Sequence, residues 1–264
     1  MEVTIVQSTD RAEELVCRTA RGDYTATDIY EPSGGVFRGD DDSDQYVKRE
    51  EGEKTSFVEP PVPFTEVMDG VDGSDIVEKK QTLMKHLIRS GHYGPFEHPQ
   101  ITFAVKGVSR VTLAQITRHR QLTFDVQSMR YVDFSDGGDV VIPKSLRSDE
   151  HVTRDEGVVD VENREYWEAK YADEAENLME MYESMVEDGV PKEDARFLLP
   201  LGTSVNFTMS GNARTFMHIC NIRSKGNAQW EVREMTDKIV QNLKTWMPNA
   251  FEMYEEHGTK KLAP

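Results

Sequence analysis

Two different spacings of apolar residues follow one another along this chain, and they constrain its fold more than any other feature. Downstream of Asp75, apolar side chains recur at the spacing of an amphipathic helix, which Gly91 ends; they are Ile76, Leu83, Met84, Leu87 and Ile88. From residue 101 to residue 105, apolar residues instead alternate with polar ones, which predicts a strand. The chain must therefore combine helices with a sheet.

The remaining segments extend this mixture without a regular strand–helix–strand alternation. We predict further strands at 3–6, 131–134, 140–142 and 204–209, and helices at 12–20, at 108–121 and from 167 to a stop at Gly189 and Pro191. Asn212 is placed to cap a helix that runs to about residue 223, and Asn227 to cap a last long helix ending before Pro248. This order favours the α+β class, with mixed helices around an antiparallel-type sheet.

Two stretches interrupt the pattern. Residues 25–75 contain the acidic run 40–44 and several prolines and glycines, and residues 135–162 are again acidic and polar. Such composition is typical of weakly ordered surface segments. We therefore predict a single domain over residues 1–264 with acidic surface insertions at about 25–75 and 135–162.

The charge balance limits the partners. Asp and Glu total 48 against 31 Lys and Arg, a net charge of −17, which argues against non-specific binding of nucleic acid. The excess of carboxylates fits either adaptation to a salt-saturated cytosol or an ordinary acidic enzyme. No apolar run is long enough for a membrane span and no signal peptide is evident, so we expect a soluble cytoplasmic protein. Cys17 and Cys220, the only cysteines, indicate neither a disulfide framework nor a metal cluster.

Arg118–His119–Arg120, followed by Ser128 and Arg130, concentrates positive charge in this acidic chain. Guanidinium groups match phosphate and carboxylate oxygens, so the cluster indicates an anion-binding site. Surface ion pairs with the many carboxylates are the alternative.

Two other segments carry polar groups of interest. His92, Glu97 and His98 lie around a Gly–Pro turn but lack the HExxH spacing of a metal site, and structural histidines are the alternative. On a helix that starts at Asn212, Arg214 and His218 lie one turn apart, and the helix start suits an anion such as a pyrophosphate. A helix cap with a surface arginine is the alternative.

Together these residues resemble a known family. Arg118–His119–Arg120, seven residues and then Ser128 resemble the signature of flavin-dependent thymidylate synthases. Other segments agree in order and near the family's spacing: Gly91–His92 with 95–98, Asn212–Ala213–Arg214, Arg223, and Ala228–Gln229 with Glu231. The resemblance spans about residues 12–255, and it implies a homotetramer of α+β subunits with FAD between subunits.

The resemblance also implies roles for individual residues. Arg223 falls on the family's key arginine, which favours ionised uracil, and we assign it the catalytic role. The residues expected to bind dUMP are Gln115, Arg118, Gln127, Ser128, Met129, Arg130, Arg196 and Arg223. Those expected to bind FAD are His92, Glu97, Arg118, His119, Arg120, Gln121, Asn212, Arg214 and His218, and no metal is expected.

The implied activity is the reductive methylation of dUMP to dTMP by an FAD-dependent methyltransferase. In this family NADPH is the reductant, 5,10-methylenetetrahydrofolate is the carbon donor, and tetrahydrofolate is released. The chain lacks a GxGxxG fingerprint, so the sequence does not choose between NADPH and NADH. Neither cysteine has the Pro–Cys–His-like context of the cysteine-dependent thymidylate synthases.

Several departures from the family pattern leave alternatives open. Thr123 replaces a serine, Val126 replaces a glutamate or glutamine that touches substrate, and Asn227 replaces a histidine beside the flavin. Gly94 and Asp23 fall where small hydroxyl residues often help to bind FAD in the family. Val126 and Asn227 would suit a flavin- or nucleotide-binding protein that has lost catalysis. An unrelated phosphate-ester enzyme built on the arginine cluster is the other alternative.

Overall fold

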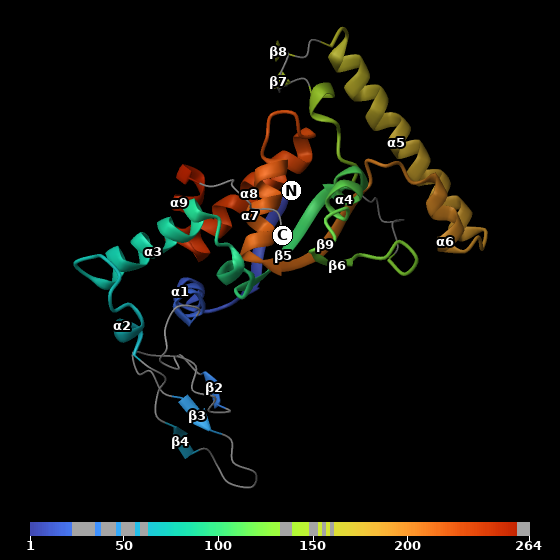
Figure 1. The fold of residues 1–264 in the computed structure, drawn as a ribbon. Coiled ribbons are helices and arrows are strands. Elements are labelled where there is room, and N and C mark those ends of the chain that lie inside the picture. The colour runs from blue at the N-terminus through green and yellow to red at the C-terminus, as the bar shows by residue number, and fades with distance from the viewer. Residues whose placement is uncertain are drawn as a thin grey trace. The chain divides into compact units, whose positions relative to one another are not determined.

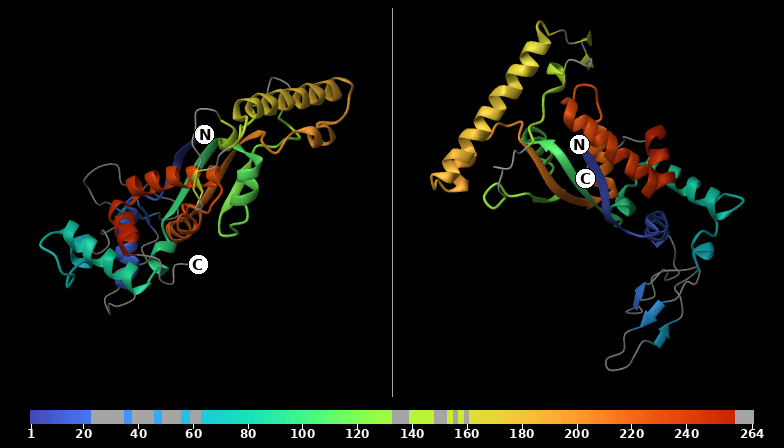
Figure 2. Two further views of the ribbon diagram at one scale, coloured as in Figure 1. Left: turned by 90° about the horizontal axis from the view of Figure 1, so that it is seen from above. Right: turned by 180° about the vertical axis from the view of Figure 1, so that it is seen from behind.

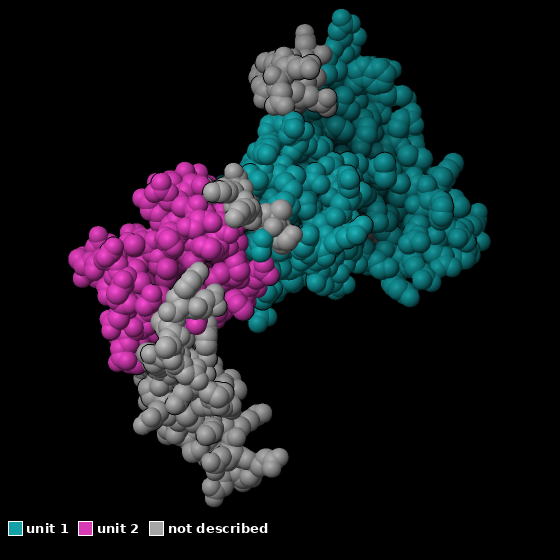
Figure 3. Space-filling view, in the orientation of Figure 1, with its two compact units in different colours: residues 1–8, 100–245, 263–264 teal, residues 9–99, 246–262 magenta. Residues whose placement is uncertain are grey.

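The computed structural model describes residues 1–22, 35–37, 46–48, 56–58, 63–132, 139–147, 153–154, 157–158 and 161–257. The chain divides into two compact units (Figure 3). Unit 1 has residues 1–8, 100–245 and 263–264, and unit 2 has residues 9–99 and 246–262.

Unit 1 is built on a four-stranded antiparallel sheet. Its strand order is β1 (Glu2–Ser8), β5 (Gln100–Ser109), β9 (Ser204–Asn212) and β6 (Thr123–Val126) (Figure 1). Val105 lies opposite Phe207, and Phe103 opposite Met209, and all four side chains are buried. Because side chains alternate across a strand, these pairs form one apolar face of the sheet. The alternation read from the sequence thus identifies the core strands, and the predicted α+β class is confirmed.

Helices of unit 1 pack on this sheet or extend beyond it. They are α4 (Arg110–Ile116), α5 (Arg164–Glu187), α6 (Lys192–Ala195), α7 (Ala213–Arg223) and most of α8 (Trp230–Trp246), with 3-10 turns η2 (Lys144–Leu146) and η3 (Arg196–Leu198). Phe216 of α7 meets the Phe103 ring edge-on, with 5.1 Å between ring centroids. The Asn242 amide of α8 donates to the Val3 carbonyl of β1 at 3.3 Å. By contrast, α5 stands away from the sheet in every view (Figure 2). A short strand pair, β7 (Thr153–Arg154) with β8 (Gly157–Val158), precedes it.

Unit 2 is largely helical among its described residues. It contains α1 (Ala12–Gly22), α2 (Phe64–Val67), α3 (Ile76–Ser90), η1 (Gly94–Glu97) and α9 (Pro248–His257), with a three-stranded sheet of β2 (Gly35–Phe37), β3 (Tyr46–Lys48) and β4 (Ser56–Val58). Asp75 caps α3 by accepting from the Val77 and Glu78 amides. Gly91 ends α3 at φ 73°, a conformation that glycine adopts without a steric penalty, as the sequence predicted.

A buried carboxylate joins two helices of unit 2. Glu13 of α1 is 7% exposed and accepts from the Ala250 amide at 3.0 Å and from the Asn249 side chain at 2.8 Å. It therefore satisfies one of the orphan backbone amides at the start of α9 and carries negative charge where the helix dipole favours it. Cys17, also on α1, is buried, and this burial raises the pKa of its thiol to about 12, so Cys17 is a core residue.

Several predicted boundaries are wrong. The predicted helix 108–121 is instead the end of β5 followed by α4, which stops at Ile116. Tyr131 and Val132 form a turn rather than a strand, and 133–134 lie outside the described residues. Around 140–142 only an isolated bridge between Val140 and Thr203 forms. Local apolar pattern cannot reveal where a strand turns directly into a helix, and here Ser109 makes that change by capping α4.

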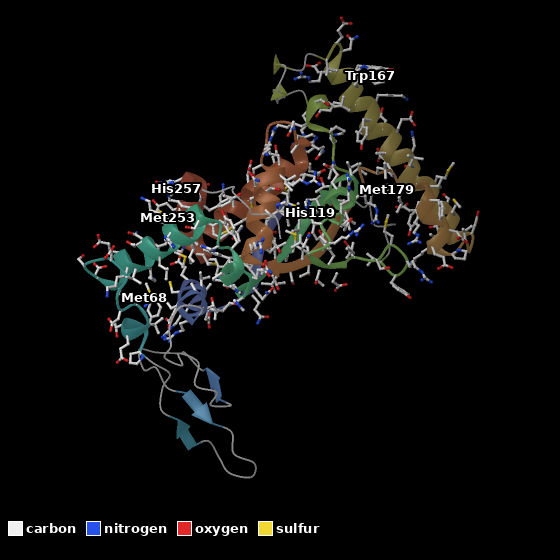
Figure 4. All side chains as sticks on the ribbon, viewed as in Figure 1. Met68, His119, Trp167, Met179, Met253 and His257 are labelled. Atoms are coloured by element: carbon white, nitrogen blue, oxygen red, sulfur yellow. The ribbon has the colours of Figure 1, made fainter. Side chains whose placement is uncertain are left out.

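Two further differences concern the end of the chain and the first predicted insertion. Asn227 does not cap α8; the Gln229 side chain does, by accepting from the Val232 amide at 2.9 Å. Helix α9 was not predicted. Within the predicted insertion 25–75, the part from residue 63 onward includes α2, and Met68 directly after it is fully buried (Figure 4). The rest of the insertion, apart from its three strands, lies outside the described residues.

Candidate active site

The segment that follows α4 lies close against the junction of β9 and α7. Gly211 makes this approach feasible, because a Cβ there would lie 2.6 Å from the Leu122 side chain and 3.3 Å from the Phe216 ring. No larger residue fits without moving one of these neighbours. The close approach brings the chain around Arg118, His119 and Arg120 toward α7, which carries Arg214, His218 and Arg223.

Arg223, at the last residue of α7, is bonded to two groups from the α4 region. Its Nε donates to Nε2 of His119 at 3.0 Å, and its guanidinium reaches the Gln115 carbonyl at 3.4 Å. His119, labelled in Figure 4, is partly buried, as is Arg223. Residues assigned to flavin and to dUMP are therefore in direct contact, 104 positions apart in the sequence.

The environment of His119 keeps its imidazole neutral. Burial, followed by the positive charge of Arg223, His218 and Arg118, lowers the pKa of His119 from 6.5 to about 4. A neutral imidazole has one nitrogen free to accept, which is what the bond from Arg223 requires. Burial and then the charge of Arg118 also lower the pKa of Arg223, which nevertheless stays cationic at neutral pH.

The start of α7 forms the second part of the site. The Asn212 side chain accepts from the Thr215 amide at 2.8 Å, which confirms the predicted cap. Burial, and then the charge of Arg214, lowers the pKa of His218. Arg120 and Gln121 are exposed on the segment before β6. Unit 1 thus supplies both cationic side chains and a helix N-terminus. These are the groups that bind a pyrophosphate.

The third part of the site consists of the residues that follow β6 and those at the start of η3. Gln127 forms two hydrogen bonds with the backbone of Asn206. Its backbone amide donates to the Asn206 carbonyl at 3.0 Å, and its side-chain oxygen accepts from the Asn206 amide at 3.3 Å. The Ser128 hydroxyl accepts from the Arg130 amide at 3.2 Å. Met129, by contrast, packs its side chain into a core cluster with Tyr182 and Ala195.

The two arginines of this part converge on the same residue. The Arg130 guanidinium pairs with the Glu193 carboxylate at 2.6 Å, and Arg196 donates to the Glu193 carbonyl at 3.0 Å. Both partners of the ion pair are about half exposed, so the pair contributes little to stability. It can exchange for a ligand phosphate at low cost.

Arg110 is a cation of this region that the sequence argument missed. Burial, and then the nearby charge of Arg196, lowers its pKa. The positive charge of Arg110 therefore adds to that of Arg196 in attracting an anion to this region. The sequence offered one signal, an arginine directly after the strand end, but nothing in that pattern distinguished it from a surface residue.

His92 and Glu97, the two remaining predicted residues, lie in unit 2, whereas all other predicted site residues lie in unit 1. Both side chains are exposed. The His92 amide donates to the Leu87 carbonyl at 2.8 Å, which fixes the turn after α3. Within the described part of the chain, no group of three or more His, Cys, Asp or Glu is arranged to hold a metal ion.

Comparison with known proteins decides the family. The thymidylate synthase complementing protein family matches residues 4–249 of this chain. The chain belongs to this family. A flavin-dependent thymidylate synthase of Haloarcula marismortui is 41% identical, and one of Halobacterium salinarum is 38% identical, each over the whole of both chains.

A solved structure supports the fold. A UMP/dUMP methylase PolB from Streptomyces cacaoi, bound with 5-Br dUMP, superposes with a TM-score of 0.71 over 97% of this chain and 95% of that chain. The two sequences are 20% identical, so the likeness concerns the fold. In the described residues, no helix combines the length and the apolar character that crossing a membrane requires.

Proposed function

We propose that this protein catalyses the reductive methylation of dUMP to dTMP, with 5,10-methylenetetrahydrofolate as carbon donor, NADPH as reductant and FAD as cofactor, and releases tetrahydrofolate. The observation that carries the proposal is the bonding of Arg223 to His119 and to the Gln115 carbonyl. It holds a partly buried cation among residues that the resemblance assigns to nucleotide and to flavin.

In this proposal the third part of the site binds dUMP. Arg130 and Arg196, with Arg118, supply cations for the phosphate, and Ser128 and Gln127 supply neutral polar groups. Gln115 contributes from α4, and Met129 contributes through its backbone because its side chain is in the core. Ser128 binds substrate and is not a nucleophile, since no general base is bonded to its hydroxyl among the contacts of the described residues.

Arg223 polarises the uracil ring. A guanidinium fixed by His119 keeps its positive charge in one place, and it stabilises the negative charge that develops on the uracil oxygens as N3 ionises. Neutral His119 contributes by accepting a hydrogen bond without adding a competing charge. The two side chains together prepare the ring to accept carbon.

The cationic segments around α7 fit FAD, because a helix start, Arg214 and the exposed Arg120 match the negative pyrophosphate. The group in unit 1 also includes His119, Gln121, Asn212 and His218. His92 and Glu97, which belong to unit 2, stay assigned to FAD by the family resemblance. When bound, FAD supplies the hydride that the methyl group requires. The chain's own residues bind, orient and polarise the reactants.

Further features of the proposal follow from the family resemblance. The protein works as a homotetramer with FAD between subunits, in the cytoplasm, with residues 1–264 forming one functional domain. Its excess of carboxylates, together with relatives from Haloarcula marismortui and Halobacterium salinarum, supports adaptation to high salt. The non-catalytic alternative is not favoured, because the cations that the chemistry needs are all present.

The proposal is tested by comparing wild type with Arg223→Ala in high salt. We expect both proteins to show flavin absorbance after FAD is added, and Arg223→Ala to lose most dTMP formation while it keeps its flavin. Near-normal turnover of Arg223→Ala would sink the assigned role. A wild-type protein that is yellow but makes no dTMP would instead indicate the non-catalytic alternative.

A further inference from the structure

Glu231 is the most deeply buried carboxylate of the site region, and all its hydrogen bonds go to one short stretch. It lies at the start of α8 and is 1% exposed. Its carboxylate accepts from the Ser109 amide at 2.7 Å, from the Ser109 hydroxyl, and from the Thr112 hydroxyl at 2.7 Å. Ser109 and Thr112 are themselves buried.

These three donors belong to the N-terminal end of α4. Ser109 is the cap of that helix, and its hydroxyl also accepts from the Thr112 amide at 3.2 Å. A negative charge at this end is favoured by the helix dipole, and the three donors replace the water that Glu231 loses on burial. Glu231 therefore fixes where α4 begins and how it is rotated.

The opposite end of α4 belongs to the site. Arg223 bonds the Gln115 carbonyl in the last turn of α4 and bonds His119 three residues beyond its end. The helix is seven residues long, so about 10 Å separates its two ends at the usual rise per residue. A change in its rotation at Ser109 is carried directly to Gln115, Arg118 and His119.

We propose that Glu231 is a positioning residue for this reaction: from α8 it sets the placement of α4 and, through α4, the geometry of Arg223 and of the dUMP-binding groups. This role rests on the proposed function. It is distinct from stabilising the fold in general, because the bonds of Glu231 reach one helix and that helix carries site residues.

A matched control exists in the same chain. Glu13 of α1 is also a buried glutamate that bonds the start of another helix, in this case α9. Helix α9 carries none of the proposed site residues. Glu231→Gln and Glu13→Gln keep side-chain size and remove one negative charge each. Thr112→Val is a milder variant that removes a single donor to Glu231 and keeps the charge.

The experiment uses FAD-loaded full-length protein in high salt. It measures melting temperature, dUMP affinity from the change in the flavin spectrum, and the kcat and KM for dTMP formation. For Glu231→Gln we expect a loss of about tenfold in kcat, the size of one lost charge-assisted hydrogen bond, and weaker dUMP binding. Thr112→Val shows the same pattern to a smaller degree, and Glu13→Gln keeps wild-type kcat even where its melting temperature falls as far.

A double variant separates positioning from general destabilisation. Glu231→Gln combined with Arg223→Lys should lose less than the product of the two single losses, since both act on α4, whereas Glu13→Gln with Arg223→Lys should be multiplicative. If Glu231→Gln and Thr112→Val keep wild-type kcat and dUMP affinity per folded molecule, the inference is wrong. If Glu231→Gln does not fold, Thr112→Val alone decides. A wild-type protein that neither binds dUMP nor forms dTMP would overturn the proposed function instead.

Discussion

Replacing Arg223 should change the acid–base behaviour of His119 in a direction that the structure fixes. Arg223 donates to Nε2 of His119 at 3.0 Å and is the second cause, after burial, of the low pKa of this imidazole. Arg223→Gln removes the charge and keeps a polar side chain. We expect the pKa of His119 to rise from about 4 toward 6.5, without reaching it, because the burial remains.

The same values give the free energy that corresponds to the whole pKa shift of His119, of which Arg223 causes a part. A pKa of about 4 instead of 6.5 would correspond to about 3 kcal/mol against the imidazolium if nothing screened the charges. His119 is only partly buried, so we reduce this to about 1 kcal/mol. The folded pKa lies below the unfolded one, so the unfolded chain binds more protons between these values. This contribution to unfolding free energy is therefore lost as pH falls from 6.5 toward 4.

The assay is a histidine titration by NMR in high salt, with His119 assigned from a His119→Asn variant. Wild-type His119 should stay neutral down to a pH of about 4. In Arg223→Gln it should titrate at higher pH, and the loss of stability between pH 6.5 and 4 should shrink. A His119 that titrates near 6.5 in wild type, or whose pKa is unaffected by Arg223→Gln, would show that Arg223 does not hold this imidazole neutral.

Three other changes probe separate parts of the account. Gly211→Ala should lower stability by about 1–3 kcal/mol in thermal melts, because its Cβ meets Leu122, and an unchanged melting temperature would contradict the close approach. Asn212→Ala should lower the free energy of unfolding by about 1 kcal/mol through loss of the α7 cap. Asn212→Asp should keep the cap but weaken flavin binding, as measured by FAD titration. Equal FAD affinity of Asn212→Asp and wild type would argue against a pyrophosphate at this helix start. Below about molar salt, the melting temperature and the population of the proposed tetramer, measured by sedimentation, should both decline as carboxylates repel one another. An assembly equally stable at low salt would contradict salt adaptation.

The sequence predicted those parts of the fold that depend on local pattern. The alternation of Ile101, Phe103 and Val105 marks a central strand, and Asn212 and Gly91 sit at helix ends where side-chain capping and left-handed backbone are needed. The point at which β5 becomes α4 was not predictable in this way. It depends on Ser109, whose capping geometry is supported by Glu231 from 122 positions away.

The candidate site, like the fold, was predictable only where it depends on residue type and spacing along the chain. The arginine cluster and the family signature indicate which residues bind ligands, because residue type and spacing are visible in one dimension. The bond between His119 and Arg223, the effect of the Arg196 charge on Arg110 and the burial of Met129 arise from tertiary packing, so they could not be read from the chain. The assigned ligand contacts themselves stay predictions.

The folate product of a single anaerobic reaction decides whether the protein carries out the proposed reductive methylation. Purified protein in high salt would be given FAD, dUMP, 5,10-methylenetetrahydrofolate and NADPH, and nucleotide and folate products would be separated and quantified. We predict dTMP and tetrahydrofolate in equal amounts, with NADPH consumed in the same proportion. Formation of dihydrofolate with dTMP, or no dTMP from flavin-loaded protein, would contradict the account.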